Sequence, residues 1–307
     1  MTGPNPDSAS PGLDAIFADP EIAQFIQGLG VRQAENIGTL AGEHLVKRCY
    51  LLHLSDATKV KLRRLRSADR AREVESLLAT AAHPSFPKPL ARQGPLLLEP
   101  WIEGSPVDAR SPDIAARCGS LLGEFHARTP LEDRFGHPVG LAKEQMEYLV
   151  QAGDRLLASE EISGKAHQVL VTTAQRLQPT EAAQGIIHGD LAPENIVIDE
   201  SGRLVVIDND QVLSHPFDYD LARAWIRWPM TGVMKMRFLD AYRRHRDPTP
   251  FQISVHFWLL CALTRAAAFR VENAVVGRNV HLYHLRRLLG TANENRRTLL
   301  YTWNSGL

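Results

Sequence analysis

The sequence has few cysteines and no signal for secretion. Only three cysteines occur in 307 residues, Cys49, Cys118 and Cys261, and no two of them form a C-x-x-C pair. This argues against a disulfide framework and a cysteine-based zinc site, and it favours buried thiols in a reducing compartment. The first residues have neither a basic region nor an apolar core, so they do not read as a secretory signal. We therefore predict a cytoplasmic protein whose residues 1–14 form a disordered tail.

Long apolar runs and an excess charge of one sign are also missing. No apolar run approaches the ~18–20 residues needed to cross a bilayer, so we expect no membrane association. The 35 Lys and Arg residues equal the 35 Asp and Glu residues in number, and a net charge of zero argues against nucleic-acid binding. With 44% hydrophobic residues, the chain can bury a large core, and we expect two lobes.

The zero net charge conceals an uneven distribution along the chain. Residues 221–307 hold thirteen Arg and one Lys against two Asp and two Glu, a net charge of +10, so residues 1–220 carry −10. Arginines of this region can bind an anionic ligand through bidentate hydrogen bonds. A solvated basic surface or a protein contact is the alternative, and the composition does not choose between them.

Residues 186–210 combine apolar strands with three spaced polar residues. Two apolar, β-branched runs flank the turn sequence D-E-S-G at residues 199–202, which predicts a β-hairpin. This hairpin and the loop before it would bring Asp190, Asn195 and Asp208 to one end of a small sheet.

These three side chains suit phosphoryl transfer, which needs an aligned nucleophile and metal ions that neutralise the phosphates. The Asp190 carboxylate can accept the proton of an attacking hydroxyl group. The Asn195 carbonyl and the Asp208 carboxylate are hard oxygen donors suited to Mg²⁺. Such residues often only cap turns, but the combined pattern is more specific than any one of them alone.

The stretch 186–222 resembles the catalytic core of the aminoglycoside phosphotransferase and choline kinase-like families, and residues 34–128 resemble them more faintly. It has their H-G-D-x-x-x-x-N sequence, an apolar strand ending in I-D, and then D-L-A. The resemblance implies a bilobal α+β fold of the protein-kinase type. A small β-rich lobe over residues 15–102 would bind nucleotide, and a mostly helical lobe over residues 103–307 would hold the catalytic and acceptor-binding groups. The resemblance also implies that backbone groups near Glu99 and Trp101 bind the adenine.

The third strand of the small lobe should carry a cation for the nucleotide phosphates. Residues 58–65 match this strand, and Lys59, Lys61 and Arg63 would share one of its faces. Relatives often read V-L-R-R here, which favours Arg63, whereas the chemistry alone favours Lys61; an exposed basic edge strand is the remaining interpretation. In the following helix, the family spacing E-x-x-x-L selects Glu73 as the partner of this cation, and a solvated carboxylate is the alternative.

Capping residues and apolar periodicity predict helices along the rest of the chain. Asp19, Ser67 and Ser111 each precede one helix. Further helices are expected over residues 142–158, 165–178, 219–228, 234–245, 252–271 and 278–299. His126 ends an apolar stripe and is expected to be a core residue rather than a metal ligand.

The sequence thus predicts a kinase that transfers phosphate from ATP (or GTP), with Mg²⁺, to a hydroxyl group of a small molecule. Asp190 is the predicted catalytic residue, Asn195 and Asp208 are the predicted metal ligands, and Asp220 is expected to hydrogen-bond the catalytic loop. The basic C-terminal region favours a neutral or anionic acceptor over a polycation. No oligomeric state is predicted.

The sequence has two alternative interpretations. A nucleotide-binding pseudokinase that acts as an interaction module is one alternative, because Asn209 stands where an aromatic residue is usual in the family. A protein kinase is disfavoured, because only 11 residues separate Asp208 from Asp220 and no A-P-E sequence follows.

Overall fold

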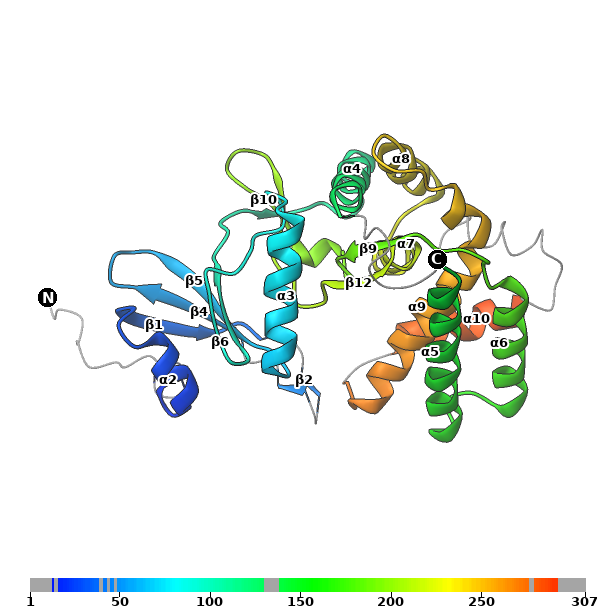
Figure 1. Ribbon diagram of the computed structural model, residues 1–307, viewed down its shortest axis with the longest axis horizontal. Coiled ribbons are helices and arrows are strands. Elements are labelled where there is room, and N and C mark those ends of the chain that lie inside the picture. Colours follow the sequence, from blue (N-terminus) through cyan, green and yellow to red (C-terminus); the bar gives the residue numbers. More distant parts are fainter. Residues whose placement is uncertain are drawn as a thin grey trace, which may run out of the picture.

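The computed structural model has two lobes, one built on an antiparallel sheet and one mostly helical (Figure 1). It describes residues 13, 16–38, 41–42, 45–46, 49–129, 138–275 and 279–291. The predicted tail over residues 1–14 lies outside these ranges except for Leu13. The α+β arrangement agrees with the predicted fold class.

Five antiparallel strands form the first lobe, in the order β1-β4-β5-β7-β6. They are β1 (Val31–Asn36), β4 (Cys49–Leu54), β5 (Lys59–Arg64), β7 (Leu96–Pro100) and β6 (Ala91–Gln93). Two short strands, β2 (Ala41–Gly42) and β3 (Leu45–Val46), pair with each other. The basic strand predicted over residues 58–65 is therefore β5, in the middle of the sheet rather than at its edge.

Helix α2 (Pro20–Ile26) packs on one face of this sheet. It begins as predicted, because the Asp19 carboxylate accepts hydrogen bonds from two backbone N–H groups of the first turn. Ile22 and Ile26 of the helix are buried in one apolar cluster with Leu52 and Leu62 of the sheet.

Helix α3 (Ala68–Ala81) lies between the sheet and the helical lobe (Figure 1). Ser67 caps it through the backbone N–H of Arg70 at 3.1 Å, as expected. Its buried residues Ala71, Val74 and Leu78 belong to the large apolar cluster of the helical lobe, not to the cluster beneath α2. Leu97 of β7 belongs to the same cluster, so α3 packs against both the sheet and the helical lobe.

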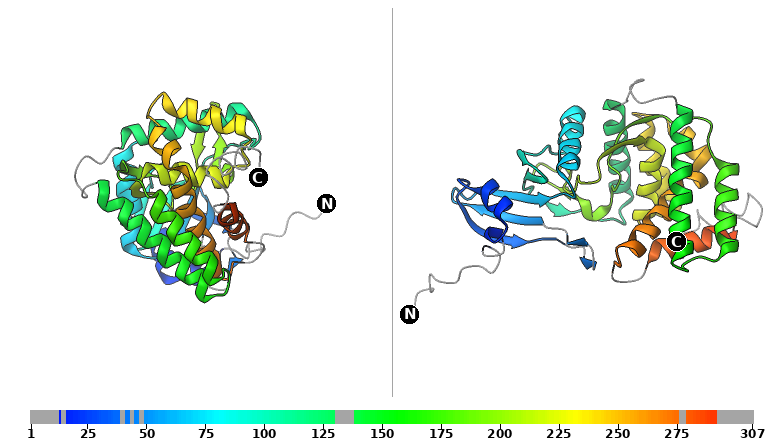
Figure 2. Two further views of the ribbon diagram at one scale, coloured as in Figure 1. Left: turned by 90° about the vertical axis from the view of Figure 1, so that its right-hand side faces the viewer. Right: turned by 60° about the horizontal axis from the view of Figure 1, so that its bottom comes forward.

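The helical lobe contains the predicted helices, and the right-hand view of Figure 2 shows them at the opposite end of the molecule from the strands of the first lobe. The helices are α4 (Pro112–Arg128), α5 (Pro138–Ala158), α6 (Gly164–Leu177), α7 (Phe217–Arg227), α8 (Gly232–Arg243), α9 (Thr249–Glu272) and α10 (Val280–Thr291). Helix α5 begins four residues earlier than expected. Residues 292–299 of the last predicted helix lie outside the described ranges.

Short strands between α6 and α7 carry the stretch singled out in the sequence. Strand β9 (Gln184–Ile187) pairs with β12 (Leu213–Pro216), and β10 (Ile196–Ile198) pairs with β11 (Leu204–Val206) and with β8 (Ser105–Pro106). The predicted hairpin is confirmed. Its turn is held by the Asp199 carboxylate, which accepts from the backbone N–H groups of Ser201 at 3.0 Å and Arg203 at 2.9 Å.

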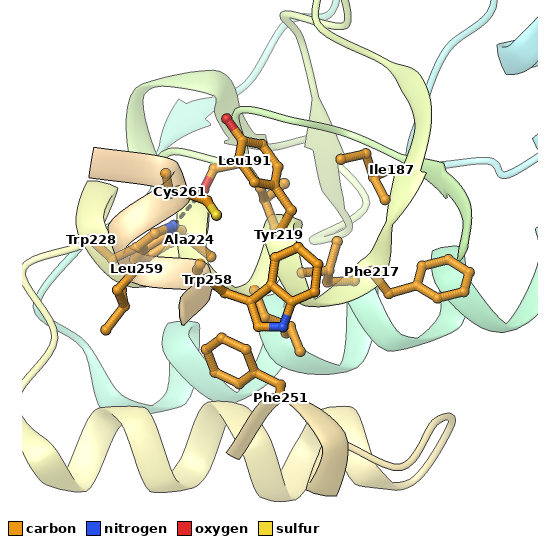
Figure 3. Packing of buried hydrophobic residues seen from close by; sticks show 14 of the residues in the cluster. Ile187, Leu191, Phe217, Tyr219, Ala224, Trp228, Phe251, Trp258, Leu259 and Cys261 are labelled. Carbon is orange, nitrogen blue, oxygen red and sulfur yellow. Dashed lines mark hydrogen bonds between the residues drawn. The ribbon is translucent and has the colours of Figure 1, made fainter. Parts of the chain in front are cut away.

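Helix α9 is the central helix of this lobe. Figure 3 shows Trp258 of α9 beneath Tyr219 and beside Phe217 of α7, in a buried cluster that also contains Leu259 and Cys261. Among the described residues, α9 is the one helix long and apolar enough to span a membrane by length and composition, which corrects the expectation that no such run exists. In the structure 72% of that apolar stretch is buried inside the protein, so core packing accounts for its composition.

Candidate functional site

The loop between β9 and η1 (Pro193–Asn195), which contains Asp190, is held in place by Asp220. The two carboxylate oxygens of Asp220 accept hydrogen bonds from the backbone N–H groups of His188 at 2.8 Å and Gly189 at 2.9 Å. His126 lies 3.2 Å from the same carboxylate, and both side chains are fully buried. The predictions that Asp220 supports the loop and that His126 belongs to the core are therefore confirmed.

Gly189 has a steric reason to be glycine. Its φ is +78°, a conformation that side chains other than glycine rarely adopt. A Cβ atom added there would lie 2.7 Å from the backbone oxygen of Gln211. The glycine in place of the usual kinase arginine thus allows the loop after Asp208 to pass directly against the catalytic loop.

Two arginines that no sequence motif distinguishes lie beside Asp190. Its carboxylate lies 2.6 Å from Nη2 of Arg223 and 3.1 Å from Nε of Arg227, both on α7. Burial raises the pKa of the Asp190 carboxyl, but the two guanidinium groups outweigh it and hold the pKa below its ordinary value. Asp190 is therefore ionised at neutral pH.

Asn195 and Asp208 meet the catalytic loop from the two strands of the hairpin. Nδ2 of Asn195 donates to the backbone oxygen of Asp190 at 2.9 Å, so this bond does not use the Asn195 carbonyl oxygen. The backbone oxygen of Asp208 accepts from His188 Nε2 at 2.8 Å. The structure thus connects all three predicted residues, and the two oxygen side chains have the chemistry that a Mg²⁺ site requires.

The cations of β5 reach the same site. Nη1 of Arg63 pairs with Asp208 and lies 3.2 Å from Asp210, and Lys61 Nζ donates to the backbone oxygen of Ile207. Lys59, by contrast, pairs with exposed Glu103 at 2.6 Å. Lys61 and Arg63 therefore both remain candidates for binding the nucleotide phosphates.

Glu99 supplies the buried counter-charge of these cations. It stands opposite Lys61 in the pairing of β5 with β7, and its Oε2 lies 3.0 Å from Lys61 Nζ and 3.1 Å from Arg63 Nε. Burial alone would raise the pKa of the Glu99 carboxyl group. The two cations have the larger effect and hold this pKa below its ordinary value. The predicted role of backbone groups near Glu99 and Trp101 in binding adenine stays a prediction.

The predicted pairing of Glu73 with the β5 cation is wrong for this structure. Oε2 of Glu73 lies 2.6 Å from Nη1 of Arg70, three residues earlier on the same helix, and the Glu73 side chain is half-exposed. Nη2 of Arg70 donates to the backbone oxygens of Asp210 and Val212, each at 2.7 Å. Glu73 therefore supports the arginine that joins α3 to the loop after Asp208.

The loop is also tied to the core behind it. Trp228, at the end of α7, donates from its indole N–H to the backbone oxygen of Leu191 at 2.8 Å, the dashed line in Figure 3. Among the described residues, no group of three or more His, Cys, Asp or Glu side chains is arranged to hold a metal ion. A cation held by Asn195 and Asp208 would therefore need further oxygen ligands, such as phosphate and water.

Comparison with known proteins agrees with this geometry. A family model described as "Phosphotransferase enzyme family" matches residues 47–252. No curated protein matches the sequence.

Solved structures show the same fold at low sequence identity. Choline kinase from Streptococcus pneumoniae has 14% identity and a TM-score of 0.69, with 92% of this chain and 99% of that chain covered. The GDP and kanamycin complex of APH(2")-IIia has 16% identity and a TM-score of 0.64, covering 92% and 99%. An amicoumacin kinase in complex with AMP-PNP and Ca²⁺ has 16% identity and a TM-score of 0.57, covering 92% and 95%. The kinase-like bilobal fold expected from the sequence is thereby confirmed.

Proposed function

The chain belongs to the phosphotransferase enzyme family, and on that premise we propose that it transfers the γ-phosphoryl group of ATP to a hydroxyl group of a small molecule in a Mg²⁺-dependent reaction. The observation that carries the proposal is the connection of Asp190, Asn195 and Asp208 around one loop. Each residue type in that set has a separate task in phosphoryl transfer.

Asp190 orients the acceptor hydroxyl group and accepts its proton. Arg223 and Arg227 lower the pKa of Asp190, which makes it a weak base. A weak base is sufficient if the transition state is loose, because the hydroxyl proton is then transferred late in the reaction. The main contribution of Asp190 is therefore orientation of the nucleophile.

Asn195 and Asp208 would hold Mg²⁺ through their side-chain oxygens. The metal, when bound, neutralises charge on the phosphate oxygens. Arg63 or Lys61 binds the phosphates from the opposite lobe, and Glu99 orients both cations. Related structures contain AMP-PNP with Ca²⁺ in one case and GDP in another, which supports a purine nucleotide with a divalent cation and leaves both ATP and GTP as donors to test.

The experiment is a screen of ATP and GTP consumption by the full-length protein against a panel of metabolites, sugar phosphates, nucleosides and aminoglycosides. With the best acceptor, Asp190→Asn should lower kcat by ~10²–10⁴ while keeping the Kd for nucleotide. Near-normal turnover by this variant would reject the assignment of Asp190. Tight Mg·ATP binding with no turnover of any acceptor would favour the pseudokinase alternative.

A further inference from the structure

The backbone around Asp190 is held by hydrogen bonds on both sides of this residue. Asp220 accepts from the backbone N–H groups of the two preceding residues, His188 and Gly189. Asn195 donates from Nδ2 to the backbone oxygen of Asp190 itself at 2.9 Å. These contacts do not set the direction of the Asp190 carboxylate, because the last side-chain torsion of an aspartate has a broad distribution.

Arg223 supplies the contact that sets this direction. Its Nε donates to the backbone oxygen of Gly189 at 3.0 Å, and its Nη2 donates to Oδ1 of Asp190 at 2.6 Å. One planar guanidinium group therefore binds the loop backbone and the carboxylate together, and its rigid donor geometry defines their relative orientation. Rotation of the carboxylate away from this position would break a charge-assisted hydrogen bond.

The two oxygens of the Asp190 carboxylate consequently have different surroundings. Oδ1 accepts from Arg223 and lies 3.1 Å from Nε of Arg227. Among the described residues, Oδ2 has only a contact of 3.4 Å with Nδ2 of Asn195, which is long for a hydrogen bond. The Asp190 side chain is 22% exposed, so Oδ2 is the oxygen that remains available to a ligand.

Helix α7 carries both groups that hold the catalytic loop. Asp220 and Arg223 are three residues apart, a spacing that places them on one face of a helix. The helix itself is fixed, because Leu221 and Ala224 are buried in the large apolar cluster. A group that orients another side chain is precise only when its own element is held in this way.

We infer that Arg223 is a positioning residue for phosphoryl transfer: it binds Oδ1 of Asp190 so that Oδ2 receives the acceptor hydroxyl group. The inference rests on the proposed function, in which Asp190 orients that hydroxyl group. Orientation of the reacting groups supplies a large part of a rate enhancement, and a misplacement of about 1 Å can cost ~10²-fold in rate.

Arg227 does not have the same geometry. Its Nε is at ion-pair distance from Oδ1 of Asp190 but has no hydrogen-bond partner among the described residues. Its Nη2 pairs with Glu194, whose side chain is 59% exposed. Arg227 therefore adds positive charge beside Asp190 without setting the direction of the carboxylate, and its substitution should lower kcat less than that of Arg223.

The test measures release of inorganic phosphate from [γ-³²P]ATP and Mg²⁺ by the full-length protein, with water as the acceptor, and the Kd for Mg·AMP-PNP. The water oxygen bonds to the γ-phosphorus, the bond to the β,γ-bridging oxygen breaks, and Asp190 accepts a proton of the water. Arg223→Gln should lower kcat about tenfold to a hundredfold and leave the Kd unchanged, because Arg223 acts on the acceptor side through Asp190. Arg223→Lys keeps the cation but not the planar donor pair, and should restore part of kcat.

Two further comparisons separate positioning from a general loss of structure. Arg237→Gln, which removes a guanidinium group paired with Asp113 on the surface of α8, is the matched control and should change neither kcat nor Kd. In the Asp190→Asn background, Arg223→Gln should cause no further loss of kcat, because residues that act as a unit are not additive. An unchanged kcat in Arg223→Gln, a loss that appears in the Kd instead, or an equal loss in both backgrounds would overturn the inference.

Failure of the proposed function has a different signature. It fails if the wild type transfers no phosphate to water or to any acceptor of the panel, or if Asp190→Asn keeps the wild-type kcat. Thermal unfolding then tests the contact alone. Asp190→Asn and Arg223→Gln each remove the same charge-assisted hydrogen bond, so the loss of Tm in the double variant should be smaller than the sum of the single losses. Additive losses would show that Arg223 does not hold Asp190.

Discussion

The substitution Glu99→Gln tests whether Glu99 is the buried counter-charge that positions the two β5 cations. The Glu99 side chain is 5% exposed and lies 3.0 Å from Lys61 and 3.1 Å from Arg63. Glutamine keeps the size of the side chain and removes its charge. In this variant Arg63 can still pair with Asp208 and Asp210, and Lys61 can still donate to the backbone oxygen of Ile207.

The size of the effect follows from these remaining contacts. Removing one partner of a buried ion pair costs ~3–5 kcal/mol when the other charge is left unpaired. Because Arg63 keeps two carboxylates, we expect a smaller loss in the free energy of unfolding, ~2–3 kcal/mol. In a chain of this length, one kcal/mol shifts Tm by roughly 2–4 °C, so Tm should fall by about 4–12 °C. The KM for ATP should rise as well, since the cations lose their fixed orientation.

Differential scanning calorimetry at several pH values is the assay. Because Arg63 and Lys61 lower the pKa of Glu99, its ionised form stabilises the fold above pH 4.5, the ordinary value for glutamate, and this stabilisation is lost as pH falls through the lowered folded-state pKa. The Tm difference between wild type and variant should therefore be full at pH 7 and shrink on acidification below pH 4.5.

Glu103→Gln is the matched control, because Glu103 pairs with Lys59 of the same strand but is 59% exposed. Its substitution should leave Tm unchanged. Equal Tm values for wild type and Glu99→Gln at pH 7, or a difference that grows on acidification, would refute the role given to Glu99.

Three other substitutions give distinct outcomes. Gly189→Ala should lower both Tm and kcat, because position 189 combines φ of +78° with a clash between the added Cβ atom and the Gln211 backbone oxygen. Gly202 has φ of +81° but no atom within 4 Å of an added Cβ, so Gly202→Ala should lower the free energy of unfolding by only about 1 kcal/mol. Equal losses of Tm in the two variants would contradict this reasoning. Asp208→Ala should abolish the rise in Tm that Mg·ATP produces, and an unchanged rise in a thermal-shift assay would show that Asp208 is not a metal ligand. Burial raises the pKa of Asp218 to about 7, so the stability of its protonated form is full below pH 3.8 and is lost as pH rises through 7. Asp218→Asn should therefore raise Tm at pH 8 and have little effect at pH 4, and a lower Tm at pH 8 would count against the buried, protonated state.

Local sequence signals were sufficient for the hairpin and most helices. The turn at Asp199 and the caps at Asp19, Ser67 and Ser111 depend on contacts within a few residues, so their sequence patterns carry the full information. The scaffold role of Asp220 was also predictable, because the D-L-A sequence follows the catalytic stretch at a short distance.

Contacts between distant elements could not be predicted in this way. Glu99 faces Lys61 only because β7 pairs with β5 in one register, and a sequence alone does not state that register. In the sequence, Arg223 and Arg227 stand out only as part of the positive charge of residues 221–307. Asp220, Arg223 and Arg227 are spaced by three and four residues, and this helical spacing was the available signal that both arginines would share a face with Asp220.

The error at Glu73 has a physical cause that was visible in the sequence. Arg70 lies three residues before Glu73 on α3, and side chains at this spacing are neighbours on a helix. The local ion pair therefore forms in place of the expected pairing with β5. The β5 cations Lys61 and Arg63 pair instead with Glu99 on the adjacent strand β7.

Helix α3 joins the two lobes through two different faces. Its apolar face is buried in one cluster with the helical lobe and with Leu97 of β7, and Arg70 holds two backbone oxygens of the loop after Asp208. On the side of the sheet, partly exposed Glu75 of α3 and Arg92 of β6 pair at 2.6 Å. Any change in the angle between the lobes would therefore have to break contacts on one of these faces, so α3 couples the position of the sheet to the loop that follows Asp208.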